Sequence, residues 1–301
     1  MSKRVAKMAL ESLPVSLPWY LCASLVLDGV SLSELPKKLY EWSDQPDFEP
    51  LYLETAQAPL ADVSPCLVAL EGQGDSILKQ YLSFAADDCG YLAFSGASWG
   101  SQVRHMRWLA QVYMPTGEKV LLRLADPAVF SALLLSATTD QRSALLGPFE
   151  LMVVPDPVGG EWHEFRQQPQ ETKVGYQRPY RLSDQQLSAL EDVSFRQALG
   201  RLDLHMKMKF PAYGADWEPA TRRAKLTQLA NSAYALGFCS EGEIRLYAGI
   251  FGLLGDTALS AHADIDQVLH ERSPQAPSQR LQHAFEMAQG RAAMLTGIGN
   301  V

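Results

Sequence analysis

Two apolar patterns alternate along the first half of the chain. Short apolar runs with strand character are separated by stretches whose apolar residues recur three or four positions apart, as on one face of a helix. The expected strands are Trp19–Leu27, Pro50–Leu53, Cys66–Leu70, Tyr91–Phe94, Ala110–Met114, Val120–Leu124 and Glu150–Val154. The expected helices are Leu32–Trp42, Ile77–Ala86, Val103–Leu109 and Ala128–Leu135. This alternation predicts an α/β (α+β) N-terminal lobe over residues 1–155, with a mixed sheet because the turn at 115–117 makes a hairpin.

The pattern changes after Pro155. Residues 156–181 are rich in Pro, Gly, Gln and charged residues, so we expect a linker there. From residue 182 onward the apolar residues keep helical spacing, and Ser183 with Gln186 and Ser240 with Glu243 have the spacing of capping boxes. Residues 182–301 are therefore expected to form an all-helical C-terminal lobe, a small bundle.

The stretch from Trp99 to Leu134 is the most informative. With residues placed 100° apart, one side of its helix is apolar, and Arg104, Arg107 and Trp108 fall on the other side with His105 on the flank. A Trp between two Arg residues on a non-core face is typical of a protein–protein anchor. The alternative is that these long side chains cover a neighbouring strand of the same chain. We predict Arg104, His105, Arg107 and Trp108 as partner-binding residues.

Three further residues of this stretch predict structure and not chemistry. Asp126 suits the N-cap of a helix, and Pro127 suits its first turn, where the missing N–H has no helical partner. Arg123 is expected to pair with Asp126 across this junction. We therefore interpret Arg123, Asp126 and Pro127 as a clamp and a cap.

A catalytic alternative rests on Gly96-Ala97-Ser98-Trp99-Gly100, which fits the G-x-S-x-G nucleophile elbow between a strand and a helix. The acids and histidines that follow in a suitable order are Asp126, Asp140, Asp156, His163 and His205. No histidine precedes His105 to supply an oxyanion segment, and the candidate histidines fall in the linker or the helical lobe. We expect Ser98 to be the N-cap of the next helix, and we keep a serine hydrolase as the alternative.

The sequence predicts neither a metal nor a cofactor. His262, Asp266 and His270 are spaced four residues apart, but such pairs are usually solvated contacts on a helix. The chain lacks a phosphate-binding glycine loop. With 301 residues, of which 47% are hydrophobic and 20% charged, it is an ordinary globular chain long enough for two domains. Its net charge of −8 argues against nucleic acid or an anionic membrane as the main partner.

The expected location is the cytoplasm. The four cysteines have no C-x-x-C spacing, which predicts reduced core thiols. A short basic stretch within residues 1–9 precedes the apolar run 18–27, but Glu11 and Pro14 interrupt the sequence between them and no small-x-small cleavage site follows. Nothing approaches the roughly 20 apolar residues of a membrane helix.

An ordered set of short motifs spans residues 19–155. They are Leu27-Asp28-Gly29, Leu51-Tyr52, Pro65-Cys66-Leu67-Val68, Arg104-His105-Met106-Arg107, Arg123-Leu124-Ala125-Asp126-Pro127 and Gly147-Pro148. Their order and spacing resemble the signature of the type VI secretion effector-adaptor chaperones, the Tap or TEC adaptor family long catalogued as a domain of unknown function. The departures are Met106, where the family commonly has Leu, and Cys66, where an aromatic residue is common.

This resemblance implies a bacterial adaptor that binds one cognate secreted effector and loads it onto the spike, VgrG or a PAAR-tipped spike. It also implies an α/β lobe followed by a helical lobe, in agreement with the hydrophobic pattern. Such a protein needs no catalytic residue, metal or cofactor, because its chemistry is binding.

Overall fold

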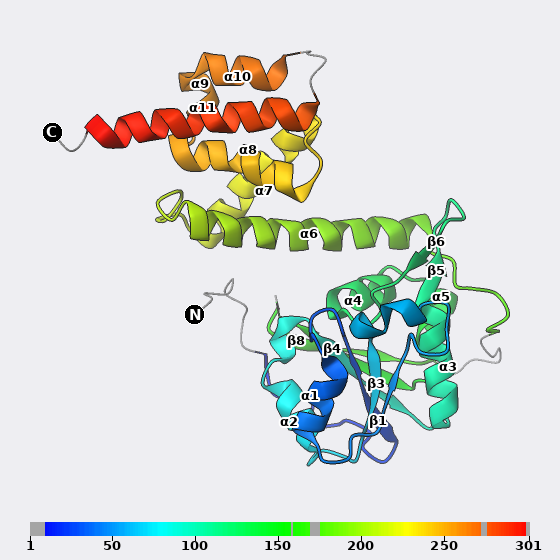
Figure 1. The fold of residues 1–301 in the computed structure, drawn as a ribbon. Helices are drawn as coiled ribbons and strands as arrows, with labels where there is room; N and C mark the ends of the chain where they lie inside the picture. The colour runs from blue at the N-terminus through cyan, green and yellow to red at the C-terminus, as the bar shows by residue number, and fades with distance from the viewer. Residues whose placement is uncertain (1–9, 158, 169–174, 272–275, 299–301) are drawn as a thin grey trace. The chain divides into compact units, whose positions relative to one another are not determined.

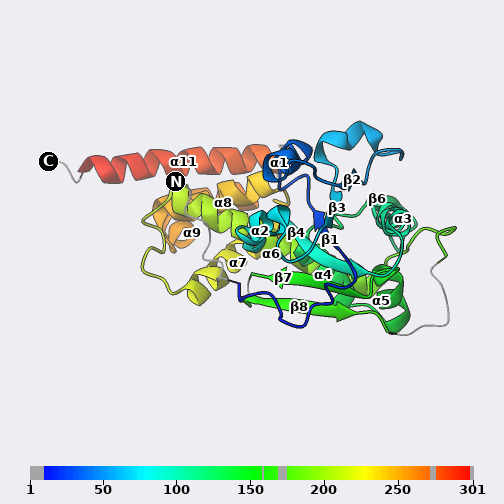
Figure 2. The same ribbon diagram turned by 90° about the horizontal axis from the view of Figure 1, so that it is seen from below.

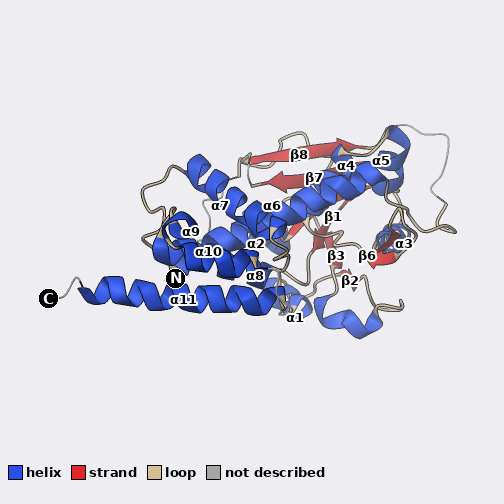
Figure 3. Ribbon diagram, turned by 90° about the horizontal axis from the view of Figure 1, so that it is seen from above, coloured by secondary structure: helices blue, strands red, loops and turns tan. Residues whose placement is uncertain are grey.

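The structure is a computed structural model that describes residues 10–157, 159–168, 175–271 and 276–298 (Figure 1). The basic stretch considered above lies outside these residues. The chain divides into two compact units, which we call the N-terminal lobe (residues 6–193) and the helical lobe (residues 194–301). Each is described by itself. All described strands belong to the N-terminal lobe (Figure 3), so the predicted α/β lobe followed by a helical lobe is confirmed.

The main sheet of the N-terminal lobe has the strand order β2-β3-β1-β4-β7-β8. The strands are β1 (Cys22–Leu27), β2 (Phe48–Pro50), β3 (Cys66–Leu70), β4 (Gly90–Ser95), β7 (Leu151–Asp156) and β8 (Glu161–Arg166). Every described pairing in this sheet is antiparallel. A separate hairpin joins β5 (Gln111–Tyr113) to β6 (Lys119–Leu121), and Tyr113 makes an isolated parallel bridge with Arg181.

Helices pack on both faces of this sheet. One face contacts α3 (Trp99–Leu109), α4 (Pro127–Leu135) and α5 (Thr139–Leu146), and the other contacts α1 (Leu35–Trp42) and α2 (Ser76–Leu82). The alternation of side chains along β1 explains this division, since Val26 points into the first core while Leu25 and Leu27 point into the second. This lobe also contains two short 3₁₀ helices, Ala58–Val63 and Ala85–Asp87, and the first part of the long helix α6 (Asp184–Lys209).

The helical lobe contains the second part of α6 (Asp184–Lys209) and the helices that follow it. These are α7 (Pro219–Ala235), α8 (Glu241–Leu254), α9 (Ala258–Ala261), α10 (Ala263–His270) and α11 (Pro277–Ile298). The capping box of Ser240 with Glu243 is confirmed at the start of α8. Of the described helices, none is both long and apolar enough to cross a membrane.

Three elements differ from the sequence-based prediction. Strand β8 forms within the predicted linker and pairs with β7 along its length (Figure 2). Helix α5 was not predicted, and the strand expected at Pro50–Leu53 is β2, which ends at Pro50.

The prediction of core thiols is confirmed for two of the four cysteines and is wrong for the other two, which are exposed. Cys66 and Cys89 are buried, and burial raises the pKa of each thiol to about 12. Cys22 and Cys239 are exposed.

Candidate functional site

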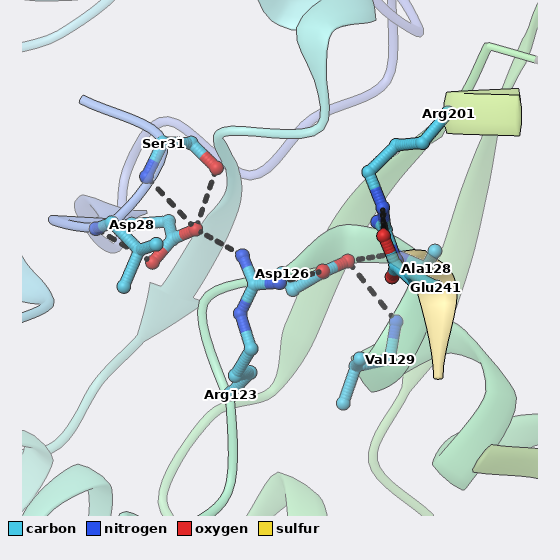
Figure 4. Close-up of polar contacts among 9 residues, drawn as sticks. Asp28, Ser31, Arg123, Asp126, Ala128, Val129, Arg201 and Glu241 are labelled. Atoms are coloured by element: carbon cyan, nitrogen blue, oxygen red, sulfur yellow. Dashed lines mark hydrogen bonds and ion pairs between the residues drawn. The ribbon is translucent and has the colours of Figure 1, made fainter. Parts of the chain in front are cut away.

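The residues predicted as a clamp and a cap lie together between β1 and α4 (Figure 4). Asp126 is the N-cap of α4: its Oδ1 accepts hydrogen bonds from the backbone N–H groups of Ala128, at 3.0 Å, and Val129, at 3.3 Å. Pro127 is the first residue of the helix. Arg123 lies with its Nη1 3.5 Å from Asp126 Oδ2, and its Nη2 donates to Asp28 Oδ2 at 2.8 Å. The clamp therefore joins the guanidinium of Arg123 to two carboxylates, those of Asp126 and Asp28. The part of Asp28 was not predicted.

Asp28 is the centre of this arrangement. Its side chain is only 6% exposed and accepts hydrogen bonds from Val30 N at 3.1 Å, Ser31 N at 3.3 Å and Ser31 Oγ at 2.7 Å, besides the bond from Arg123. Burial acts to lower the pKa of Arg123, but the hydrogen bond and charge of Asp28 outweigh it and the pKa is raised. A buried carboxylate with this many donors holds the end of β1 and the chain after β6 together.

The close approach of the chain around Ser64 explains why the third position of the Leu-Asp-Gly motif, Gly29, is glycine. A Cβ atom here would lie 2.2 Å from the carbonyl oxygen of Ser64, so only glycine fits. Ser64 Oγ in turn accepts the backbone N–H of Tyr52 at 3.0 Å, and Leu51 N donates to the carbonyl of Pro65 at 2.8 Å. The motifs around residues 27–29, 51–52, 65–68 and 123–127 thus contact one another.

His105 is buried inside the N-terminal lobe and does not reach the surface. Its Nε2 lies 2.9 Å from the carbonyl oxygen of Leu145, to which it donates as the neutral ring. Burial lowers the pKa of this imidazole to about 4, against the opposing effect of the Leu145 hydrogen bond. Gly147 has a φ of +55°, and a Cβ atom there would lie 2.2 Å from the ring. The histidine motif and the Gly147-Pro148 motif therefore pack directly against each other.

Arg107 and Trp108 contact other segments of the N-terminal lobe. The guanidinium of Arg107 pairs with Glu49 and lies 3.5 Å, Nη1 to Oε2, from Glu54. Trp108 Nε1 donates to the carbonyl of Arg178 at 2.8 Å, and its ring packs edge-on against Tyr176 and Tyr180. These two side chains hold the segments 49–54 and 176–180 against α3. This agrees with the alternative interpretation of the sequence, in which these long side chains cover a neighbouring segment of the same chain.

Arg104 is the exposed member of the predicted set. Its Nη2 donates to Ser101 Oγ at 3.3 Å, and its guanidinium carbon lies 5.5 Å from the centroid of the Tyr176 ring. An exposed cation–π contact of this kind contributes about 0.5–1 kcal/mol and orients the cation without removing it from solvent. A cationic and aromatic surface therefore remains at this end of α3.

The elbow residue Ser98 lies between β4 and α3, as the motif requires, and is exposed. It occupies the N-cap position of α3, but its side chain makes no capping bond and its Oγ lies 2.9 Å from Ser101 Oγ. The histidine candidate of the N-terminal lobe, His163, lies instead beside Asp156 and Glu161. Within the described part of this lobe, the structure does not assemble the triad.

Two groups of side chains contain possible metal ligands. Asp156, Glu161 and His163 have ligand atoms within 4.8 Å of one another, but all three side chains are partly exposed and form His–carboxylate pairs at 3.4 Å. His270 pairs with Asp266 at 3.2 Å, and His262 Nδ1 lies 2.6 Å from a guanidinium nitrogen of Arg291. Such contacts are common without a metal, and we assign none.

The segment that contains these motifs is similar to known proteins. Residues 23–144 match the family described as Domain of unknown function (DUF4123). The chain is also 29% identical over 271 residues to Accessory protein VasW of Vibrio cholerae serotype O1 (strain ATCC 39315 / El Tor Inaba N16961), covering 88% of this chain and 86% of that protein. No solved structure matches. Residues 23–144 therefore resemble a DUF4123 domain, and the predicted resemblance to the type VI secretion effector-adaptor chaperones is confirmed.

Proposed function

We propose that this protein is a bacterial, cytoplasmic adaptor-chaperone that binds one cognate type VI secretion effector and loads it onto a VgrG or PAAR spike protein. The DUF4123 domain and the similarity to an accessory protein over most of the chain support this proposal. The adaptor acts by binding alone, so it uses no catalytic residue, metal or cofactor. Its proposed partners are proteins, with neither nucleic acid nor membrane among them.

The observation that carries the proposal is that the motif residues make structural contacts within the chain. Asp28 and Arg123 join two chain segments, Asp126 caps α4, and His105 donates to a backbone carbonyl. These groups position the backbone and are not arranged around a substrate. Such a frame is what a protein needs if its function is to present a stable surface to another protein.

The surface that we assign to partner binding in the N-terminal lobe is the exposed end of α3. Arg104 contacts the partner directly, whereas Arg107 and Trp108 position the neighbouring segments 49–54 and 176–180. His105 lies beneath this surface and supports α3 from inside. An exposed guanidinium over an aromatic ring favours a partner segment that offers carboxylates or backbone carbonyls.

Co-purification from the native host tests the proposal. The tagged protein should retain one effector and one spike protein, and Arg104→Glu should weaken retention of a partner about tenfold, the size expected for reversing a rim charge. Lys37→Glu, an equal change of charge at an exposed residue of α1, is the control. If the protein retains neither an effector nor a spike protein, the proposal fails.

The serine hydrolase is separated from this proposal by an active-site probe. Because Ser98 Oγ faces Ser101 and not a histidine, we expect no labelling by a fluorophosphonate. Labelling of the wild type that disappears in Ser98→Ala would contradict the non-catalytic role.

A further inference from the structure

An apolar hollow lies on the helical lobe, where α6, α7 and α8 meet. Phe195, Leu199 and Leu202 of α6 line it, together with Tyr234 of α7 and Ile244 of α8. These walls are only partly covered: Tyr234 is 44% exposed, and Phe195 and Leu199 are half-buried. We call this hollow the α6–α8 groove. All of its residues belong to the helical lobe, so its shape does not depend on the other lobe.

Positive charge borders the α6–α8 groove. Two guanidinium groups share the single carboxylate of Glu241: Arg201 Nε lies 3.1 Å from both oxygens (Figure 4), and Arg245 Nη2 lies 3.2 Å from Oε2. Glu241 and Arg245 are themselves part of the lining. One carboxylate does not neutralise two guanidinium groups, so these three side chains together carry a net positive charge.

The same border continues along α6. Arg201, His205 and Lys209 are four residues apart and therefore lie on one face of the helix. Burial lowers the pKa of His205, and the positive charges of Arg245 and Lys209 lower it further, which places both cations close to the ring. The ring is therefore neutral, and the positive charge of this face comes from Arg201 and Lys209. The chain has a net charge of −8, so the cations Arg201, Arg245 and Lys209 form a local cluster of the opposite sign.

The groove and its border select one kind of occupant. The hollow has room for one apolar side chain, and the partly exposed Tyr234, Phe195 and Leu199 around it can contact others that recur three or four residues apart on the same face of a helix. The cations beside it pair with carboxylates on the flanks of that helix and repel a basic one. An acidic amphipathic helix meets both conditions.

We propose that the α6–α8 groove docks an acidic amphipathic helix of the cargo protein. This inference rests on the proposed function for the identity of the partner, but the chemistry of the groove is testable without any cargo. The protein as a whole repels acidic molecules through its net charge, so preference for an acidic helix has to come from the local cations.

Two synthetic helices serve as probes. Both are fluorescein-labelled peptides of 20 residues (about 30 Å of helix) with the same leucine positions; one carries Glu at its remaining charged positions and the other carries Lys. With the full-length protein, fluorescence anisotropy should show the Glu peptide binding at least about tenfold more tightly than the Lys peptide, with affinity that falls as salt is added.

Three variants localise the binding. Arg245→Glu should weaken binding of the Glu peptide about tenfold. Ala198→Trp fills the groove without changing the charge and should abolish binding of this peptide. Lys37→Glu in the N-terminal lobe should leave it unchanged. A photo-reactive phenylalanine at Tyr234 should cross-link the Glu peptide, and the same residue at the exposed Tyr40 should not. Circular dichroism confirms that each variant is folded.

The outcomes separate this inference from the proposed function. Equal affinity for the two peptides, or Glu-peptide binding unaffected by both Arg245→Glu and Ala198→Trp, overturns the inference, and it does so even if an effector co-purifies. Selective binding of the Glu peptide at Tyr234, in a protein that retains no effector, keeps the groove as a helix-binding site and refutes the adaptor role.

Discussion

Replacing His105 by Gln should change how the stability of the N-terminal lobe depends on pH. The imidazole is buried, its Nε2 donates to Leu145, and its Nδ1 has no partner in the described structure. Protonation would place a charge in the core, which is why the pKa falls from 6.5 to about 4. Gln cannot take up this proton in either state.

The sign and size of the effect follow from this pKa. Above pH 6.5 the ring is neutral in both the folded and the unfolded chain, so its titration has no effect on stability. As the pH falls from 6.5 towards 4, the unfolded chain binds a proton that the folded chain does not, and stability is lost. The gap between the two pKa values corresponds to a total of about 3 kcal/mol, of which about 2 kcal/mol is already lost at pH 5.

Urea unfolding at pH 7 and pH 5 measures this. Tryptophan fluorescence reports mainly on the N-terminal lobe, which contains Trp19, Trp42, Trp99, Trp108 and Trp162. At pH 7 we expect His105→Gln to be about 1–2 kcal/mol less stable than the wild type, because packing around the ring is lost. At pH 5 the two proteins should be about equally stable, since the wild type alone carries the cost of keeping its histidine neutral.

The exposed His283 provides the matched control, because His283→Gln removes an imidazole that is outside any core. Comparison of wild type and variant at each pH cancels the titration of all other groups. If the difference between wild type and His105→Gln is the same at pH 5 and pH 7, then His105 is not a buried neutral ring and the account of α3 given above is wrong.

Three other predictions concern the frame of the two lobes. Gly147→Ala should cost about 3 kcal/mol in urea unfolding because the methyl group would meet a buried ring, whereas Gly237→Ala, at a φ of +85° with nothing within 4 Å, should cost about 1 kcal/mol. A double-mutant cycle on Asp28→Asn and Arg123→Gln should give a coupling energy of about 1–2 kcal/mol, and a value near zero would exclude the clamp. A thiol-reactive reagent should modify the two exposed cysteines rapidly and the two core thiols only after unfolding, because burial raises their pKa to about 12.

The elements that sequence patterns predicted are those with a buried apolar face. Cys66–Leu70 was predicted with its observed bounds, since nearly all of its residues are buried. Strand β8 was missed because its residues are mostly polar: it pairs with one neighbour at the edge of the sheet and buries only Phe165 well. Helix α5 had a readable signal in the capping box of Thr138 with Gln141, which lies just after the predicted end of α4.

The candidate site shows where helical periodicity stops being informative. The 100° spacing placed Arg107 and Trp108 away from the core side of α3, but the direction of a side chain from its own helix does not reveal what covers that face. Glu49 and the segment 176–180 cover it here, and both are distant in sequence. His105, on the flank, became buried because the chain around Gly147 closes over its ring.

The contacts between motifs also explain what recognition of the domain does and does not say. Asp28 meets Arg123 across 95 positions, and His105 meets the chain around Gly147. An ordered set of such motifs identifies a frame of internal contacts. These contacts stabilise the lobe and do not determine which partner is bound. We propose that exposed residues that do not hold this frame together, such as Arg104 and those of the α6–α8 groove, decide which partner is bound. The distinction is measurable, because substitutions in the frame should lower stability and binding together, whereas substitutions at those exposed residues should lower binding in a protein of unchanged stability.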